Sequence, residues 1–286
     1  MPPIENISDT ARWIATYRAM ESERPDAIFR DPYARKLGGA RGEEIVATLP
    51  KAHDSSWALV VRTKVLDEII MERVAHGVDL VVNLAAGLDT RPWRLDLPAT
   101  LRWVDVDLPG ILQYKTETLA GETPRVRYEA IHTDLTDVAA RDALFAKLGA
   151  TASNALVITE GLLVYLETEQ VQSLARALHA VPSFRWWTCD LANHRLLEFL
   201  NKQWGADLAR GNAPMKFAVD EAESFFAALG WHVVELRSAL IEAHRLKREM
   251  RMGWFTRFMV RISPIKQAEE VRRMSTFALM ERIEER

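Results

Sequence analysis

The sequence predicts an α/β fold with a doubly wound, mostly parallel sheet of seven strands, and three observations favour it. After residue 78, short apolar runs typical of strands covered on both faces alternate with helical patterns. Of the 286 residues, 48% are hydrophobic and 27% charged, which is enough apolar material for a sizeable core. The chain has no internal repeat and no low-complexity tract. We therefore expect residues 1–286 to form a single domain.

The first 77 residues are expected to form a helical cap ahead of the sheet. A short helix is predicted over Thr10–Met20, and the turn at residues 24–26 ends it because it contains Pro25. A stronger helix is predicted over Ser55–Ala75, because apolar side chains recur there every four residues. This stripe consists of Trp57, Val61, Val65 and Ile69.

The predicted sheet occupies residues 78–237 and 275–286. Its seven strands are expected at residues 79–87, 102–108, 126–132, 154–159, 184–190, 231–237 and 275–282. Helices are predicted between them, and the one before the sixth strand is expected to begin with a capping box of Asp220 and Glu223. Strands that alternate with helices in this way indicate parallel pairing.

Residues 238–274 interrupt this alternation as an insert. The insert contains nine Lys or Arg residues against four Asp or Glu, and it is amphipathic. We favour a helical excursion on the surface or a lid over the site. A helix lying on a membrane surface is the alternative.

Charge and cysteine content limit the classes of function. The chain has 37 basic and 40 acidic residues, a net charge of −3, so no basic excess points to a nucleic-acid partner. Cys189 is the only cysteine, which excludes an internal disulfide and makes a reducing cytoplasm the simplest compartment. Residues 1–12 lack the apolar core of a signal peptide, and no apolar stretch is long enough for a membrane span. We therefore expect a cytoplasmic globular protein.

The first predicted strand ends in a turn of small residues. Ala85, Ala86 and Gly87 are followed by Asp89, and only Gly87 matches the three glycines of a dinucleotide-binding fingerprint. The negative charge of Asp89 repels phosphate and tolerates a neutral or cationic ligand. A nicotinamide-dependent oxidoreductase is therefore a weaker alternative, and a tight turn without a ligand accounts for these residues equally well.

The second predicted strand ends with two carboxylates. Asp105 and Asp107 share one face of the strand, because side chains alternate with a period of two. Asp107 follows Gly87 by 20 residues, the position at which such folds hold the ribose of a nucleotide. A divalent metal and a solvated strand edge are the alternatives, and no second cluster of metal-binding residue types supports the metal.

The third and fourth predicted strands also end in acidic residues. Asp134 and Leu135 suit an adenine, whose amino group can donate to the carboxylate while the ring packs on the leucine. Glu160 stands among apolar residues, where an unpaired carboxylate is costly. Its partner is either an ammonium or sulfonium group of a ligand, or an arginine such as Arg62.

Four segments together resemble the leucine carboxyl methyltransferase-like family. They are Asn83–Arg94, Val104–Pro109, Thr133–Leu135 and Ile158–Tyr165, and they occur in the family's order and spacing. The family includes protein phosphatase methyltransferases and bacterial polyketide O-methyltransferases. The resemblance implies a class I methyltransferase fold, Rossmann-like with an antiparallel last strand, and S-adenosyl-L-methionine as the cofactor.

The resemblance also implies nine cofactor-binding positions. They are Arg18, Arg62, Ala85, Gly87, Asp105, Asp107, Asp134, Leu135 and Glu160. The two arginines would bind the cofactor carboxylate, and the turn from Ala85 to Gly87 would lie beneath the methionine part. The sequence departs from the family at Ala85, where the family has a glycine.

The remaining roles follow from the same resemblance. Asp107 would hold the ribose with Asp105 as its neighbour, Asp134 and Leu135 would hold the adenine, and Glu160 would lie near the methionine amine. No metal is expected. A second copy of the chain is one candidate partner.

The expected reaction is methyl transfer to an oxygen of a small apolar molecule. A carboxylate acceptor is favoured over a phenol, because it needs no general base. His194 could serve a phenol, but a helix-surface position is favoured for it, so no catalytic residue is assigned. Residues 1–75 and 238–274 are expected to build the acceptor pocket, and five side chains of the insert suggest an apolar acceptor or a dimer contact: Met252, Trp254, Phe255, Phe258 and Met259. A binding module that holds the cofactor without turnover is the alternative.

Overall fold

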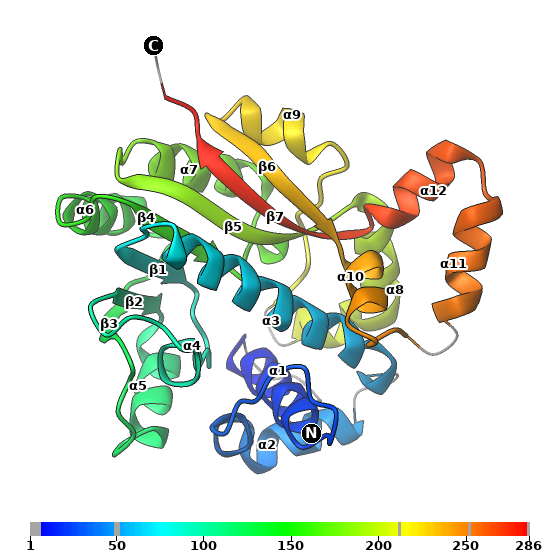
Figure 1. Ribbon diagram of the computed structural model, residues 1–286, viewed down its shortest axis with the longest axis horizontal. Coiled ribbons are helices and arrows are strands. Elements are labelled where there is room, and N and C mark those ends of the chain that lie inside the picture. Colours follow the sequence, from blue (N-terminus) through cyan, green and yellow to red (C-terminus); the bar gives the residue numbers. More distant parts are fainter. Residues whose placement is uncertain (1–6, 49–51, 211–212, 251–252, 285–286) are drawn as a thin grey trace.

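One sheet of seven strands crosses the centre of the protein in the order β3-β2-β1-β4-β5-β7-β6 (Figure 1). The computed structural model describes residues 7–48, 52–210, 213–250 and 253–284. The strands are β1 (Leu80–Leu84), β2 (Arg102–Asp107), β3 (Arg127–His132), β4 (Ala155–Thr159), β5 (Phe184–Ala192), β6 (Trp231–Ser238) and β7 (Ser275–Arg282). β7 runs antiparallel to β5 and β6, and the other neighbouring pairs are parallel. The predicted fold class is confirmed.

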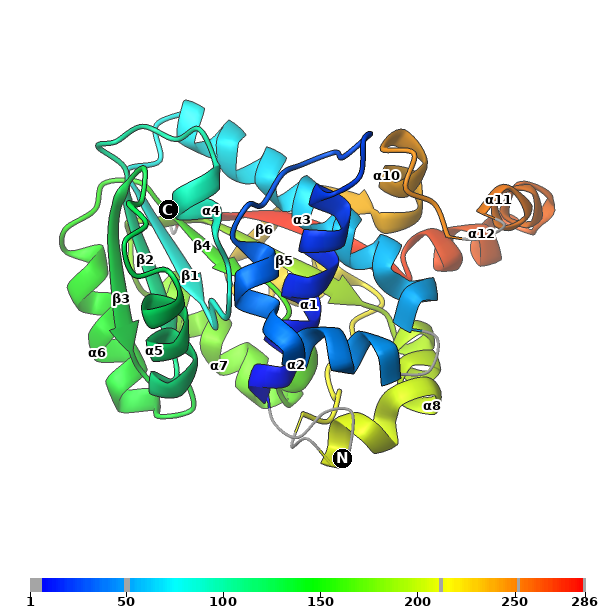
Figure 2. The same cartoon turned by 90° about the horizontal axis from the view of Figure 1, so that it is seen from below.

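Helices cover both faces of the sheet. They are α1 (Ile7–Ser22), α2 (Ala34–Thr48), α3 (Ala52–Ala75), α4 (Arg91–Arg94), α5 (Pro109–Thr118), α6 (Val138–Gly149), the 3₁₀ turn η1 (Leu163–Tyr165), α7 (Thr168–His179), α8 (His194–Arg210), α9 (Ala222–Ala227), α10 (Ala239–Arg245), α11 (Gly253–Ile262) and α12 (Ile265–Arg272). α6, α7 and α9 pack on one face, and α3 and α10 on the other. α1 and α2 lie beyond α3, at the edge where the strands end (Figure 2).

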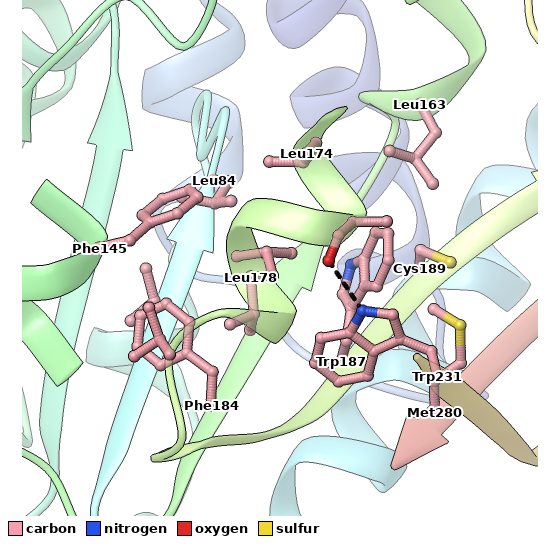
Figure 3. Close-up of a cluster of buried hydrophobic side chains, with 14 of the residues drawn as sticks. Leu84, Phe145, Leu163, Leu174, Leu178, Phe184, Trp187, Cys189, Trp231 and Met280 are labelled. Carbon is pink, nitrogen blue, oxygen red and sulfur yellow. Dashed lines mark hydrogen bonds between the residues drawn. The ribbon is translucent and has the colours of Figure 1, made fainter. Parts of the chain in front are cut away.

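The core on the α7 face is centred on two tryptophans. Trp187 of β5 and Trp231 of β6 meet edge to face, with ring centroids 5.4 Å apart (Figure 3). The indole of Trp231 donates a hydrogen bond to the carbonyl of Ala175 over 3.0 Å, so its polar atom is satisfied inside the core. β1 and β4 are buried along their whole length, which explains their unbroken apolar sequences.

One predicted helix start is wrong. α9 begins after Glu221, and no side chain caps it. The carboxylate of Asp220 instead accepts the backbone N–H of His194 over 3.1 Å and lies 2.9 Å from Nδ1 of that ring. A tertiary contact with the start of α8 therefore takes the carboxylate that the local pattern assigned to α9.

The described residues of the insert after β6 form the helices α10, α11 and α12. α10 packs against α3, whereas α11 and α12 extend from the side of the molecule and pack on each other (Figures 1 and 2). None of the helices that the structure describes combines the length and the apolar character needed to cross a membrane.

Candidate functional site

The carboxyl ends of the strands open into one large cavity. β1 lies between β2 and β4, so the chain order reverses there and leaves a crevice at the ends of these strands. The cavity has a volume of about 1330 Å³. Single-ligand pockets usually occupy roughly 300–1,000 Å³, so this one has room for two ligands side by side.

Eight of the nine predicted site residues line this cavity. They are Arg18, Arg62, Ala85, Gly87, Asp107, Asp134, Leu135 and Glu160. The fold thus gathers side chains from α1, α3 and the ends of β1 to β4 around one space. Asp105 is the exception, because it is fully buried beneath the surface of the cavity.

Asp107 is fixed at the end of β2 by backbone donors. One carboxylate oxygen accepts the N–H of Gly87 over 2.7 Å, and the other accepts the N–H of Leu108 over 2.7 Å. Burial raises the pKa of Asp107, and the two backbone donors oppose that rise only in part. The side chain therefore ties the turn after β1 to the end of β2 and presents a carboxylate to the cavity.

Asp105 has only protein partners. Its carboxylate accepts hydrogen bonds from Lys115 Nζ (2.5 Å), Trp103 Nε1 (2.8 Å), Tyr128 Oη (2.9 Å) and Asn83 Nδ2 (3.2 Å). Lys115 is itself fully buried, so the pair is a salt bridge inside the protein. Lys115 thus neutralises the buried carboxylate, and Asp105 supports the site from below rather than facing the cavity.

The turn between β1 and α4 holds two residues in the left-handed region. Ala85 has φ 53° and Gly87 has φ 52°. The conformation suits Gly87, whereas a residue with a Cβ pays roughly 1–2 kcal/mol for it. Since both residues are small, the backbone of the turn borders the cavity directly.

Glu160 at the end of β4 is paired with two arginines. Its carboxylate lies 3.0 Å from Nε of Arg62 and 2.8 Å from Nη1 of Arg91. Burial favours a higher pKa for Glu160, but the charges of Arg91 and Arg62 outweigh burial and lower the pKa. Of the two partners that the sequence left open, the structure provides the arginine, and 16% of the Glu160 side chain remains exposed to the cavity.

Asp190, near the end of β5, is not among the nine residues predicted to bind the cofactor. Its carboxylate accepts the N–H of Gly161 over 2.6 Å and the Nη1 of Arg62 over 3.0 Å, and it lines the cavity. Arg62 thus lies between the ends of β4 and β5, with Glu160 on one side and Asp190 on the other. An acidic residue that ends a parallel strand was the signal that could have identified it.

A buried ionic network fixes two further arginines that line the cavity, Arg91 and Arg18. Arg91 contacts Asp67 over 2.6 Å and Asp89 over 2.8 Å, in addition to Glu160. Arg18 contacts Asp31 over 2.9 Å, and its other end donates to a backbone carbonyl. Each guanidinium has at least two partners, so its orientation is fixed before any ligand arrives.

Asp134 and Leu135 follow β3 at the far end of the same cavity. The carboxylate of Asp134 accepts the hydroxyl of Thr136 over 2.7 Å and its backbone N–H over 2.9 Å, which lowers the pKa of Asp134. Asp134 is exposed, so it can still reach a ligand. Leu135 packs against the edge of the core with its side chain half-buried.

The opposite wall of the cavity is apolar and aromatic. It is built mainly by α1, α3, α8 and the strand ends, with Trp13, Trp57, Phe199, Leu200, Trp204 and Phe277. The insert contributes Leu240, Met250, Val271 and Met274. Segments before β1 and after β6, far apart in sequence, therefore close the cavity together.

Of the five aromatic or sulfur side chains predicted from the insert, the structure describes two, and neither belongs to this wall. Met252 lies outside the described residues, as do the side chains of Phe255 and Phe258. Trp254 is 62% exposed, Met259 is 43% exposed, and neither lines the cavity. His194 is also outside the cavity lining, at the exposed start of α8 beside Asp220.

Comparison with known sequences identifies the family. Residues 11–179 match the family described as leucine carboxyl methyltransferase. A protein of Mycolicibacterium smegmatis named as a candidate S-adenosyl-L-methionine-dependent methyltransferase is 32% identical over 254 residues, which is 80% of this chain and 84% of the relative. A Streptomyces avermitilis protein with the same kind of name is 31% identical, over 80% of this chain and 86% of the relative.

Solved structures agree on the fold. A DUF574 family protein from Streptomyces avermitilis has a TM-score of 0.58 at 15% identity, covering 94% of this chain and 96% of the other. A candidate methyltransferase from Thermobifida fusca has a TM-score of 0.58 at 14% identity, covering 99% and 96%. The fold is that of class I methyltransferases, and the chain belongs to the leucine carboxyl methyltransferase family.

Proposed function

We propose that the protein is an S-adenosyl-L-methionine-dependent O-methyltransferase that acts on a carboxylate or phenol of a small apolar molecule. The observation that carries the proposal is the convergence of Asp107, Asp134 and Glu160, from the ends of three strands, on one cavity that is large enough for two ligands. Family membership and the names of the relatives support methyl transfer from this cofactor.

The charges along the cavity fit the cofactor. Its methionine part carries an ammonium and a carboxylate, and the wall around Arg62 offers both signs of charge. We assign Asp107 to the ribose hydroxyls and Asp134 with Leu135 to the adenine. Glu160 would face the ammonium.

The remaining cofactor contacts come from the cap and the first turn. Arg62 and Arg18 would hold the methionine carboxylate, since both are cationic and line the cavity. The turn from Ala85 to Gly87 would pass beneath the methionine part, because its small side chains leave room there.

The protein's own part in the reaction is orientation. When bound, the cofactor would supply a methyl group on a sulfonium, from which the acceptor oxygen would displace a neutral thioether. The apolar wall excludes water and holds the acceptor oxygen in line, and orientation of this kind is worth roughly 7–11 kcal/mol of the barrier. A carboxylate acceptor needs no base, whereas a phenol has to give its proton to a cavity group such as Asp190.

We further propose that different parts of the chain bind the cofactor and the acceptor. Residues 78–237 and 275–284, together with Arg18 and Arg62 of the cap, would hold the cofactor, and the rest of the cap together with the insert at 238–274 would form the acceptor side. The support is that α1, α3 and the insert supply much of the apolar wall. The insert would then act as part of a lid over the acceptor.

Calorimetry with S-adenosylhomocysteine tests the cofactor assignment. Asp107→Asn removes a charged acceptor from the cavity, and hydrogen bonds to charged groups contribute about 1.5–3 kcal/mol, so we expect binding weaker by about 10-fold to 100-fold. Asp96→Asn is the control, since that side chain is 99% exposed and lies outside the cavity. Equal affinities in the two variants would remove the proposed map.

Turnover needs a separate experiment. The protein is incubated with methyl-labelled cofactor and a panel of apolar carboxylic acids and phenols, and methyl esters and ethers are separated by chromatography. A labelled ester supports a carboxylate acceptor, and a labelled ether supports a phenol. Tight cofactor binding without any labelled product across the panel would instead favour a binding module.

A further inference from the structure

The turn between α11 and α12 presents two aliphatic side chains to solvent. Ile262 is 59% exposed and Ile265 is 90% exposed. We call residues 261–266 the α11–α12 tip. The turn between the two helices projects from the side of the molecule (Figures 1 and 2). Single exposed apolar residues are common, but here two isoleucines three positions apart are both exposed.

Cations surround these two isoleucines. Arg261 and Lys266 flank the two isoleucines and are exposed, and Arg272 is exposed at the other end of α12. Within the described residues, these three cations have no carboxylate at ion-pair distance, whereas Glu269 is already paired with Arg273 over 2.9 Å. The tip therefore offers positive charge that the protein itself does not neutralise.

The surrounding insert has the same charge bias. Residues 238–274 contain nine Lys or Arg residues against four Asp or Glu, although the whole chain has a net charge of −3. Part of this charge is neutralised by the body, as Arg245 is by Glu68 and Arg248 by Glu21. Within the described residues, Arg261 and Lys266 at the projecting tip have no such ion pair. An anionic partner is the one that this distribution attracts.

We propose that the α11–α12 tip docks the protein on a membrane surface that contains anionic lipids. Ile262 and Ile265 enter the boundary between headgroups and acyl chains, and Arg261 and Lys266 contact lipid phosphates. Apolar side chains flanked by cations bind membranes in this way. A tip of six residues is also small for a protein interface, which needs about 800 Å² from each partner.

The tip is close to the cavity along α12. Val271, near the end of α12, lines the cavity, and it lies six residues from Ile265, or about 9 Å along the helix. An apolar acceptor could therefore pass from the lipid to the acceptor wall. This entry path rests on the proposed function, whereas the docking itself does not.

Flotation of the full-length protein with lipid vesicles tests the docking. One vesicle type contains phosphatidylcholine with roughly one third phosphatidylglycerol, whose anionic headgroups give a negative surface potential, and the other contains phosphatidylcholine alone. We expect binding to the anionic vesicles only. The double variant Ile262→Ser/Ile265→Ser should bind them at least 10-fold more weakly, and Lys266→Gln about fivefold more weakly.

The matched control is Ile241→Ser on α10. Ile241 is 55% exposed on the same insert, but it belongs to a helix that packs against α3. This variant should bind anionic vesicles like the unmodified protein. Circular dichroism and calorimetry with S-adenosylhomocysteine check that each variant is folded and keeps its cofactor site.

Three outcomes would overturn the proposal. The first is no binding of the unmodified protein to anionic vesicles, and the second is equal binding by the double variant. The third is a dimer in analytical ultracentrifugation that the double variant abolishes, which would assign the tip to a second copy of the chain. None of these results bears on methyl transfer, so the failure of docking and the failure of the proposed function are distinguishable.

Discussion

The two walls of the cavity are built on different principles. In the charged wall, which lies at the strand ends, Arg62 of α3 is held between the carboxylates of Glu160 and Asp190. In the apolar wall, side chains such as Trp57 and Phe199 come from helices of the cap and from α8. A group that must be bound in one orientation requires fixed donors and acceptors, whereas an apolar acceptor requires mainly shape. The contrast explains why cofactor residues form local motifs and acceptor residues do not.

At the end of β2, two carboxylates on the same strand face have different roles, one structural and one exposed to the cavity. Asp105 is fully buried with Lys115, whereas Asp107 lines the cavity and is held by backbone donors. The two residues are chemically identical and two positions apart. Depth below the cavity surface, and the partner available there, therefore decides which one is structural and which one can face a ligand.

The largest expected effect comes from Lys115→Met. The change leaves the Asp105 carboxylate buried without its cation, and breaking a buried ion pair costs about 3–5 kcal/mol. Urea unfolding followed by circular dichroism should show this loss in the free energy of unfolding. If instead Asp105 were a ligand-binding residue, the variant would lose cofactor affinity and keep its stability.

Lys64→Met is the matched control for that experiment. Lys64 pairs with Glu68 over 3.4 Å on α3, with both side chains partly exposed. Partly exposed pairs contribute about 0–1 kcal/mol, so the control should unfold almost like the unmodified protein. Equal losses in both variants would show that burial does not separate the two ion pairs.

Glu160→Gln is expected to have the next largest effect. Glutamine fills the same space but leaves Arg62 and Arg91 each without one charged partner, which should cost about 1.5–3 kcal/mol in unfolding free energy. The exposed pair of Glu284 and Arg185 provides the control, and Glu284→Gln should change stability by less than about 1 kcal/mol. No loss in Glu160→Gln would mean that the remaining partners of Arg62 and Arg91 are sufficient to hold them.

Acidification should weaken the same wall. Burial works against ionisation of Asp31, Asp89 and Glu160, but neighbouring arginines outweigh it and lower all three pKa values below the ordinary 3.8 for Asp and 4.5 for Glu. The stabilisation is complete above these ordinary values, where the unfolded chain is also ionised, and it is lost as the pH falls below them. Urea midpoints from pH 7 down to pH 3 should fall most steeply below about pH 4.5.

Glu160→Gln separates this contribution from general acid unfolding. The variant has already lost one of the three carboxylates, so its urea midpoint should fall less between pH 5 and pH 3 than that of the unmodified protein (the interval spans the ordinary carboxyl pKa values). Parallel curves for the two proteins would show that Glu160 contributes nothing to the pH dependence.

Much of the charged wall could be predicted from sequence, because its residues directly follow recognisable strands. Asp107 ends β2, Glu160 directly follows β4 and Asp134 follows β3 by two residues, and the crevice of a parallel sheet brings strand ends together. The burial of Asp105 could not be predicted in this way, since it depends on Lys115 from the next helix. The pairing of Arg91 could not be predicted either, because it also depends on contacts between distant segments of the chain.

The apolar wall was the least predictable part. Its side chains, such as Trp204 on α8, are ordinary apolar residues of amphipathic helices, and only the packing shows that they border a cavity. The capping box at Asp220 failed for the same reason, because His194 from another element takes that carboxylate. Long-range packing thus overrides local pattern wherever two distant segments meet.

The smallest expected effect on stability comes from a substitution in the turn between β1 and α4, which borders the cavity. Ala85 adopts φ 53°, which costs a residue with a Cβ roughly 1–2 kcal/mol, so Ala85→Gly removes strain. Glycine also gains freedom in the unfolded chain, which offsets about 0.4–1 kcal/mol, and we expect a net stabilisation of about 0.5 kcal/mol. At the neighbouring Ala86, outside the left-handed region, the same change should destabilise by about 0.4–1 kcal/mol. Urea unfolding of the two variants should therefore give shifts of opposite sign, and two losses of equal size would show that Ala85 is not strained.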